Sequence, residues 1–456
     1  MLEMEKHRQL WRRASFLKEY HFLEFFALLI LFRIALDMTY ESVISTRFAY
    51  MGFFNRASVN WKIVSWIVVL LGNCAVYKAY TNWDNCLSFE ILFMLYIMAF
   101  VPFTSMIGFG AYEPGYIVAN VLYWSFLLLF GMMRLGRMSR RRIVLLGKGR
   151  RKLGDAQIVM LSLVFAAVVL YVSGRYARFR LNFDLLAVYE FRAEAASNNL
   201  PKVLVYLFSW SRNLNAIIVA YFIRRKKYLW AAFSSLIQLL AFGYDGSKST
   251  FFLLVLAVII SFLPAFSLQE LNKWFLRGVA ILASVCLIVY MTSGNYLLIS
   301  LFTRRVFFMP ARLAKDYFNF FSENTPDFFR QSFMRFFGFS SPYPNIATMI
   351  GREYFGYDMG ANNGLIADAM ANLGYGGIVI FPALISIVLK LFDRSSKDLD
   401  PRIYATVSVY VAMVLTNSFL FVSLLTHGLI VTILLLAAMK RDFGYEIEAV
   451  PGENGS

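Results

Sequence analysis

The chain has 456 residues, of which 59% are hydrophobic, 18% aromatic and only 16% charged, and it carries a formal net charge of +17. Soluble domains are roughly 45–50% apolar and about 25% charged, so this composition argues against an ordinary water-soluble enzyme. It predicts an all-α, polytopic integral membrane protein with a single membrane domain over residues 1–456.

Twelve apolar runs have a length near the 20 or so helical residues that cross a bilayer. The first follows a basic N-terminus, and because no small-residue cleavage site comes after it, we expect it to be kept as a span. The seventh run is short. The runs are 20–39, 61–79, 88–106, 115–133, 156–174, 203–222, 229–243, 249–265, 275–293, 373–391, 403–421 and 426–439.

Basic residues orient these predicted spans, because Lys and Arg accumulate in short cytoplasmic loops. Most of the 45 basic residues fall on one side, with a large cluster at 134–152, so both termini are predicted to be cytoplasmic. Two predicted outer segments, 175–202 and 294–372, are basic, although positive charge on the outer side is not needed to orient the spans. Their charges either pair with nearby acids on a solvated face or bind a phosphate-bearing ligand, which guanidinium groups hold bidentately.

The first outer segment, 175–202, is predicted to hold a short amphipathic helix that ends near Pro201. Glu190 and Glu194 are four residues apart on one face of this helix, with Arg192 nearby. Two carboxylates at that spacing repel each other, which tends to raise one pKa toward the range that suits a general base. An ordinary solvated helix face is the alternative.

Two basic residues stand out in the spans that follow. Arg212 lies near the middle of the run 203–222, where burying a charge costs about 2.5–3.5 kcal/mol, so it should face a cavity or an ion-pair partner. The stretch 243–250 superficially resembles a nucleotide-binding P-loop, but a serine separates Gly246 from Lys248 and the spacing fails. We predict instead a tight turn that presents Lys248 and backbone N–H groups to an anion at the start of a span.

The largest outer segment, 294–372, interleaves phenylalanines with basic residues, a pattern suited to helices at the membrane interface. Pro310 is placed to begin one of them. Arg305 and Arg312 are seven residues apart, so we expect them near one helical face, with Arg304 beside them. This face could hold a lipid pyrophosphate. The alternative is a peripheral amphipathic helix that binds anionic headgroups without specificity.

His427 lies near the outer end of the last apolar run and is the only histidine on the predicted outer side. A lone histidine is not a metal site, and a packed residue of the bundle is an alternative to a functional one. Since that side has no cluster of histidines and carboxylates, neither a metal nor a cofactor is predicted. Asp398-Leu-Asp400 resembles the metal-binding D-x-D of sugar-nucleotide transferases, but it falls in a predicted cytoplasmic loop.

Three stretches together resemble the bacterial O-antigen or oligosaccharide repeat-unit polymerases of the Wzy type. The number of spans and the large outer loop before the last three also look like that family, and the resemblance covers residues 180–440. Some family members carry paired Arg…Gly motifs in two outer loops, and the arginines of 175–192 and 304–312 lack a glycine at that spacing. The three stretches are 189–194, 246–248 and 363–377.

The resemblance implies a glycosyltransferase of the bacterial inner membrane with its active site facing the periplasm, in O-antigen or capsular polysaccharide synthesis. It would transfer the growing glycan from undecaprenyl pyrophosphate to a new undecaprenyl-pyrophosphate-linked repeat unit. These two lipids would be its partners, with membrane lipid and a polysaccharide chain-length regulator; no nucleic acid is expected. Basic side chains would stabilise the departing pyrophosphate.

Specific residues are assigned to these roles as a hypothesis. The candidate bases that take the proton of the acceptor hydroxyl are Glu194, with Asp368 and His427 as second choices. The candidate pyrophosphate-binding residues are Arg192, Arg212, Lys248, Arg304, Arg305 and Arg312.

A flippase for lipid-linked oligosaccharide and an O-antigen ligase remain alternatives. Transporters often contain two-fold repeats, which neither hydropathy nor motifs reveal in this chain, and they seldom insert an outer loop as large as 294–372. A ligase uses the same donor chemistry and stays open. A membrane acyltransferase fits less well, because His427 has no obvious acidic partner nearby.

Overall fold

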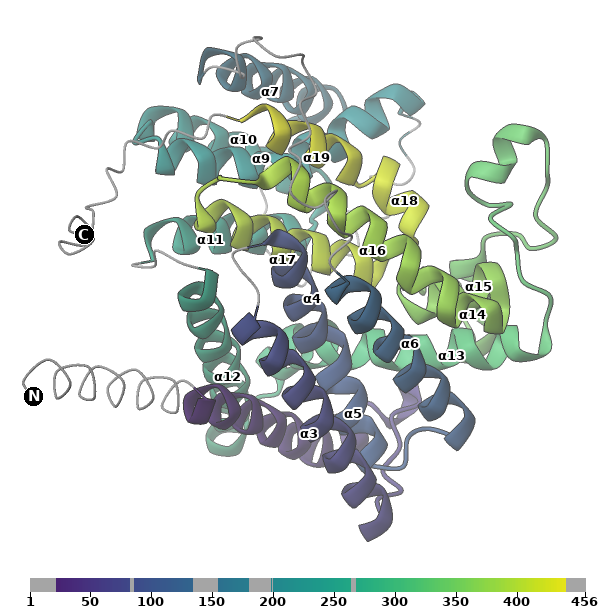
Figure 1. Ribbon diagram of the computed structural model, residues 1–456. Coiled ribbons are helices and arrows are strands. Elements are labelled where there is room, and N and C mark those ends of the chain that lie inside the picture. The colour runs from purple at the N-terminus through teal and green to yellow at the C-terminus, as the bar shows by residue number, and fades with distance from the viewer. Residues whose placement is uncertain are drawn as a thin grey trace, which may run out of the picture. The chain divides into compact units, whose positions relative to one another are not determined.

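The computed structural model of the protein describes residues 22–82, 86–133, 155–179, 198, 200–263 and 268–439 (Figure 1). Every regular element within these residues is a helix. The chain forms two compact units. Unit 1 comprises residues 1–140, 265–393 and 408–425, and unit 2 comprises residues 141–264, 394–407 and 426–456.

Unit 1 contains the larger number of described helices, including three π-helical stretches (η1, η3 and η5) and three 3₁₀ turns (η2, η6 and η7). Its elements are a helix over 22–39, η1 (Tyr40–Ile44), α2 (Ser45–Arg47), η2 (Ala49–Met51), α3 (Val59–Asn82), α4 (Leu87–Leu95), η3 (Tyr96–Phe100), α5 (Val101–Gly108), α6 (Pro114–Met132), α12 (Leu268–Ser293), η5 (Ile299–Phe308), α13 (Met309–Glu323), η6 (Phe333–Phe337), α14 (Ile346–Phe355), α15 (Ile366–Leu373), η7 (Gly374–Gly376) and α18 (Leu420–Leu425). The helices α16 (Gly377–Ser396) and α17 (Pro401–Asn417) contribute residues to both units.

The interior of unit 1 is built on the continuous segment formed by α4, η3 and α5. This segment is apolar around most of its circumference, with Glu90 as its one charged residue, and 94% of its most apolar stretch is buried. It packs against α3, and α4 also packs against α6. The π-helical η3 ends two residues before Pro102, whose ring nitrogen lacks the N–H of a regular helical hydrogen bond. Tyr96 of η3 donates to Oδ1 of Asn73 in α3 at 2.6 Å, which fixes the two helices together.

Unit 2 is a group of helices around α9 (Lys202–Arg224). It also contains α7 (Asp155–Ala177), α10 (Tyr228–Asp245), α11 (Lys248–Phe262) and α19 (Leu429–Ala438). The helix α9 packs against α7, α10 and α11 (Figure 1). Apolar side chains of α7, α9 and α10 form one cluster, in which Val172, Phe208 and Tyr244 each represent one helix. Burial of this cluster holds the three helices together.

The protein is a helical membrane-embedded protein. Seven described helices are long and apolar enough to cross a bilayer. They cover Val59–Ala79, Leu87–Gly108, Pro114–Met132, Asp155–Ala177, Lys202–Arg224, Glu270–Ser293 and Ile366–Ser396. Three further apolar helices, Tyr228–Tyr244, Lys248–Phe262 and Leu429–Ala438, are shorter. The prediction that twelve runs cross the membrane, and the predicted orientation, therefore stay predictions.

The predicted helices within 294–372 are present as η5, α13, η6 and α14. Pro310 lies in the first turn of α13, which confirms its predicted place. The α-helical geometry assumed for the spacing of Arg305 and Arg312 is wrong for residues 299–308, because they form the wider turns of a π-helix. Arg305 is exposed, whereas Arg312 is buried.

Candidate functional site

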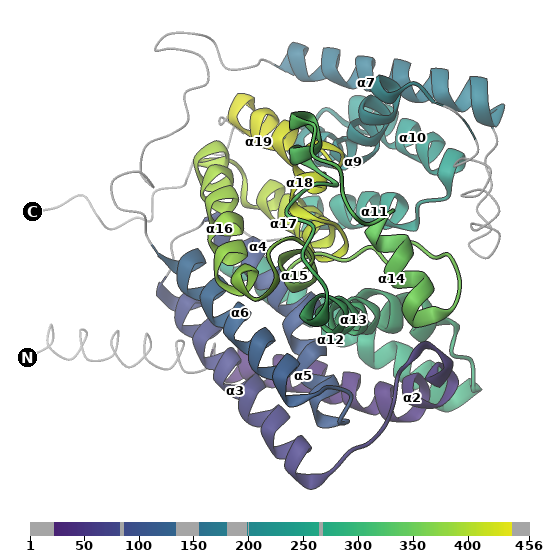
Figure 2. The same cartoon turned by 90° about the vertical axis from the view of Figure 1, so that its right-hand side faces the viewer.

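A polar cavity of about 170 Å³ lies in unit 1. It is bordered by α13, the chain that follows α13, the start of α14, the chain before α15 and the turn between α17 and α18. Figure 2 shows α13 and α15, which pack directly against each other, at the centre of this region. Amide side chains dominate its walls, namely Gln331, Asn345, Asn362, Asn363 and Asn372.

One wall of the cavity is the chain after α13, which is bonded to the C-terminal end of α15. The N–H groups of Asp327 and Phe328 donate to the carbonyl oxygens of Ala371 and Asn372 at 2.7 and 3.1 Å, and that of Phe329 donates to Oδ1 of Asn372 at 2.9 Å. These bonds satisfy carbonyls that the end of a helix leaves open. Phe328 and Phe329 have φ angles of 52° and 63°, the strained left-handed conformation that is common at functional sites.

The carboxylate of Asp327 organises the rest of this wall. It is fully buried, and it accepts from the backbone N–H of Gln331 at 2.8 Å and from the hydroxyl of Ser341 at 2.5 Å. The amide of Gln331 in turn donates to the carbonyl of Tyr343 at 3.1 Å and accepts from the N–H of Ile346 at 3.2 Å. These contacts fix residues 327–346 before any ligand is bound.

Asp368, a predicted catalytic residue, lies directly behind the cavity wall. Only 2% of it is exposed. Its Oδ1 accepts from Nδ2 of Asn372 at 2.7 Å, and its Oδ2 accepts from the N–H of Leu420 at 2.5 Å. Both carboxylate oxygens are thus already hydrogen-bonded, and Asn372, not Asp368, lines the cavity. This geometry makes Asp368 a residue that positions Asn372.

The stretch 363–377, which carries part of the family resemblance, is shaped by close backbone approaches. A Cβ atom on Gly364 would meet the carbonyl oxygens of Leu415 and Ser418, and Gly364 donates its N–H to the carbonyl of Thr416 at 3.0 Å. The neighbouring Leu365 has a φ of 54°. The glycine therefore lets the start of α15 lie against the end of α17, which places the 418–420 turn beside the cavity.

Three polar groups of the cavity are open to a ligand. The amide of Asn362, Nδ2 of Asn345 and the hydroxyl of Ser418 have no hydrogen-bond partner among the residues that the structure describes. Asn345 and Asn362 are exposed, so the cavity opens at their side. Two aromatic rings, those of Tyr317 and Phe419, form its apolar faces and pack against each other edge to face at 6.0 Å.

The predicted pyrophosphate-binding residues of unit 1 lie in different surroundings. Arg304 stacks over the ring of Phe48, with its guanidinium carbon 4.4 Å from the ring centre, and donates to the hydroxyl of Ser300 at 3.1 Å. Arg305 is exposed. Arg312 forms an ion pair with Asp316 and donates to the carbonyl of Gly52 at 3.1 Å. Arg312 thus holds α13 to the chain before α3.

Arg312 is the least accessible of the three. It is 8% exposed, and burial lowers the pKa of its guanidinium below the usual range. Asp316 is 1% exposed, so the two charges compensate each other in the interior. Removing one partner of such a buried pair strongly destabilises the protein, because the other charge stays buried without compensation. Arg305 is the exposed basic residue of this group.

The predicted residues of unit 2 lie on separate helices. Arg212 of α9 is half-buried and is close enough to His427 for its charge to act on the imidazole. The neighbouring Asn213 donates to the backbone carbonyl of His427 at 3.4 Å. Lys248 is the first residue of α11 and follows the left-handed Gly246, which ends α10. The tight turn expected at this position is confirmed.

The structure brings some of the predicted residues together and leaves others apart. Arg304 and Arg305 adjoin on η5, and Arg212 lies near His427. Arg192 and Glu194 lie outside the described residues, as does the helix predicted around them.

Sequence reasoning missed most of the cavity. Asn363 and Asn372 belong to the stretch that resembles the polymerases, but Gln331, Asn345 and Asn362 were not singled out. Three asparagines within 345–363 are a weak signal, because asparagine is also common in turns. What makes them a site is the folding of residues 327–346 onto α15, which periodicity does not reveal.

Comparisons with known proteins add no relative: no family model, curated protein or solved structure matches the chain.

Proposed function

We propose that the protein polymerises lipid-linked oligosaccharide repeat units, by transferring a growing glycan from undecaprenyl pyrophosphate to a new lipid-linked repeat unit at the outer face of a bacterial inner membrane. The observation that carries the proposal is the amide-rich cavity, to which the segment 324–363 contributes most of the lining residues. This segment belongs to the predicted outer loop 294–372, where such a reaction would take place.

The chemistry of the cavity suits a sugar. Each sugar hydroxyl is both a donor and an acceptor, and a side-chain amide offers both functions in one planar group. Asn345 and Asn362 supply such amides at the open side, and Ser418 adds a hydroxyl to the cavity wall. The ring of Phe419, which is partly exposed, suits the apolar C–H side of a sugar ring. A cavity of about 170 Å³ has room for one sugar residue of the acceptor, while the rest of the repeat unit would extend through the opening.

In the proposed transfer, the hydroxyl oxygen of the acceptor sugar forms a bond to the anomeric carbon of the donor glycan. The bond from that carbon to the pyrophosphate breaks, and the electron pair leaves with the pyrophosphate. Arg305 and Arg304 are the candidates in unit 1 to stabilise this charge. The roles of Arg192, Arg212 and Lys248 stay predictions. Arg312 is a weaker candidate than Arg305, because Asp316 already neutralises its charge.

The acceptor hydroxyl gives up its proton to a base. Glu194 remains the first candidate and His427 the second. Asp368 becomes a positioning residue, because a base must reach the proton at about 2.6–3.2 Å and Asn372 stands between Asp368 and the cavity. A flippase or ligase remains the alternative function.

Surface glycan on a gel tests the function. Loss of the gene for a polymerase leaves lipid bearing a single repeat unit, whereas loss of a flippase or ligase leaves none, and this second result would refute the proposal. Purified protein given synthetic lipid-pyrophosphate repeat units, with and without a chelator, should form polymer in both cases.

Variants of the cavity test the site. Asn345→Ala and Asn362→Ala each remove groups with a net hydrogen-bond contribution of about 0.5–1.5 kcal/mol, so polymer formation should fall by roughly 2- to 12-fold. Asn295→Ala is the matched control, because Asn295 is an exposed amide of the same outer segment that does not line the cavity. Equal activity of all three variants at equal membrane abundance would remove the cavity from the site.

A further inference from the structure

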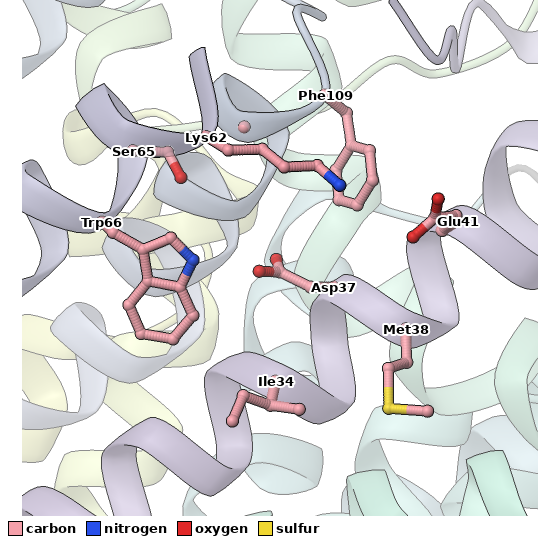
Figure 3. A pocket seen from close by; sticks show the side chains of 9 residues that line it. Ile34, Asp37, Met38, Glu41, Lys62, Ser65, Trp66 and Phe109 are labelled. Atoms are coloured by element: carbon pink, nitrogen blue, oxygen red, sulfur yellow. The ribbon is translucent and has the colours of Figure 1, made fainter. Parts of the chain in front are cut away.

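Unit 1 contains a second cavity, of about 190 Å³, which the proposed function does not use. It lies among the helix over 22–39, the N-terminal part of α3 and the end of α5. Charged side chains of both signs and two aromatic rings line it, namely Asp37, Glu41, Lys62, Trp66 and Phe109 (Figure 3).

A buried arginine holds one wall of this cavity in place. Arg33 is 1% exposed; its Nε donates to Oδ1 of Asp37 at 2.8 Å, and its terminal nitrogens donate to the hydroxyls of Ser65 and Thr104 at 2.9 and 3.2 Å. Ser105 donates to the same Oδ1 at 2.5 Å. Within the described residues no hydrogen bond goes to Oδ2 of Asp37, so this oxygen is left for a ligand.

The remaining charges face each other without pairing. Figure 3 shows the amine of Lys62 beside the ring of Phe109, with the carboxylates of Asp37 and Glu41 turned toward the same space. The amine lies 5.9 Å from the centre of that ring. Glu41 and Lys62 are both exposed, and no ion pair joins either of them to another described residue. With Asp37 balanced by Arg33, the cavity offers one separated negative and one separated positive charge.

A surface of the membrane-spanning part adjoins the cavity. Its lining includes Ile34 and Met38, which are 41% and 44% exposed, and Ile63 and Ile67 of α3 are exposed beside it. The helix α3 is a candidate span, and Lys62 lies close to its N-terminal end. Basic and aromatic side chains at this depth are typical of the headgroup region. An occupant would therefore have apolar chains beside it and a polar head within the cavity.

We propose that this cavity binds the headgroup of a phospholipid with a primary ammonium, of the phosphoethanolamine kind. The ammonium donates to Oδ2 of Asp37 and to Glu41, and the phosphate accepts from Lys62. A zwitterion matches the two separated charges. An anionic glycerol headgroup would leave Glu41 without a counter-charge, and a quaternary ammonium has no N–H to donate to the carboxylates.

Competition among lipids tests this inference. The purified full-length protein is equilibrated with equimolar phosphatidylethanolamine, phosphatidylglycerol and phosphatidylcholine in detergent, and the retained lipid is identified by native mass spectrometry. We expect phosphatidylethanolamine to be retained over the other two. Equal retention of phosphatidylcholine would refute the hydrogen bonds to the carboxylates, and equal retention of phosphatidylglycerol would refute the zwitterion.

Two variants with exposed side chains test the residues without disturbing the buried Arg33. Glu41→Gln and Lys62→Ala should each reduce the retention of phosphatidylethanolamine by roughly two- to fivefold, the effect of one partly exposed ion pair. The matched control is Lys78→Ala, because Lys78 is exposed on the same helix about 24 Å farther along it. Unchanged retention in Glu41→Gln and Lys62→Ala would overturn the proposal.

A further arm separates a lipid from a soluble compound with the same head. Glycerophosphoethanolamine, which lacks acyl chains, should not displace the lipid at equal concentration. Displacement as effective as that by the lipid itself would show that the apolar side chains beside the cavity take no part.

Discussion

The hydrogen-bonded chain that joins Leu420, Asp368, Asn372 and Phe329 can be tested by exchanging its two central side chains. In the variant Asp368→Asn, the new amide can accept from Leu420 with its oxygen, but its nitrogen then faces Nδ2 of Asn372. If the side-chain amide of Asn372 rotates by 180°, its oxygen accepts from the new amide at position 368. Its nitrogen then faces the backbone N–H of Phe329, so two donors meet there instead. Rotation of the amide only moves the clash of two donors from one hydrogen bond to the next and does not remove it.

One buried donor is therefore left unsatisfied, which costs about 1–3 kcal/mol. The double variant Asp368→Asn/Asn372→Asp reverses the bond between the two side chains: residue 368 accepts from Leu420 and donates to residue 372, which accepts from Phe329. It loses only the donation from Nδ2 of Asn372 to the backbone carbonyl of residue 368. Thermal unfolding of the purified proteins should show a destabilised single variant and a double variant that is more stable than it. A double variant no more stable than Asp368→Asn would refute the arrangement.

Polymer formation by the double variant separates two roles of the carboxylate. If Asp368 positions Asn372, as the geometry indicates, the double variant should recover at least part of the activity that the single variant loses. A stable double variant without any polymer would instead make the carboxylate at position 368 a direct participant, and would return it to the candidate bases.

Two further pairs of variants follow from the same region. Gly364→Ala places a Cβ atom against two backbone carbonyl oxygens and should destabilise the protein by about 1–3 kcal/mol in thermal unfolding. Gly376→Ala is the control, because the space around its Cβ atom is open, and it should have little effect. Equal unfolding temperatures of the two variants would contradict the close approach at Gly364. Arg312→Ala leaves Asp316 buried and unpaired, which costs about 3–5 kcal/mol, so folded protein in the membrane should fall, while Arg305→Ala should keep its abundance and lose long polymer on a gel. Wild-type polymer with Arg305→Ala would remove that residue from pyrophosphate binding.

Much of the helical layout could be predicted because the signal is local. The run 61–79 lies within α3, the run 88–106 lies within the segment from α4 to α5, and the run 203–222 lies within α9. An uninterrupted apolar stretch of spanning length has few alternatives to a helix in a membrane. The start of α13 at Pro310 is equally local, since proline suits the first turn of a helix.

The geometry of the site is not local, and sequence patterns do not reveal it. The spacing of Arg305 and Arg312 assumes 3.6 residues per turn, and the π-helical η5 breaks that assumption. The pair of Arg33 and Asp37 has the i,i+4 spacing of a helical ion pair and was open to prediction. The amide cavity was not, because it depends on residues 327–346 folding back onto α15, a contact between segments that carry no shared pattern.

The nearly complete burial of the segment from α4 to α5 has a consequence for how the protein is made. Glu90 of this segment is fully buried, and Asn272 of α12 lies beside it. A carboxyl group facing lipid is unfavourable, yet about 180 residues must be synthesised before Asn272 emerges. This span is therefore expected to stay with the insertion machinery, or to be shielded by its earlier neighbours, until α12 arrives. Biogenesis of unit 1 would then finish with the docking of α12, long after its central helix has left the ribosome.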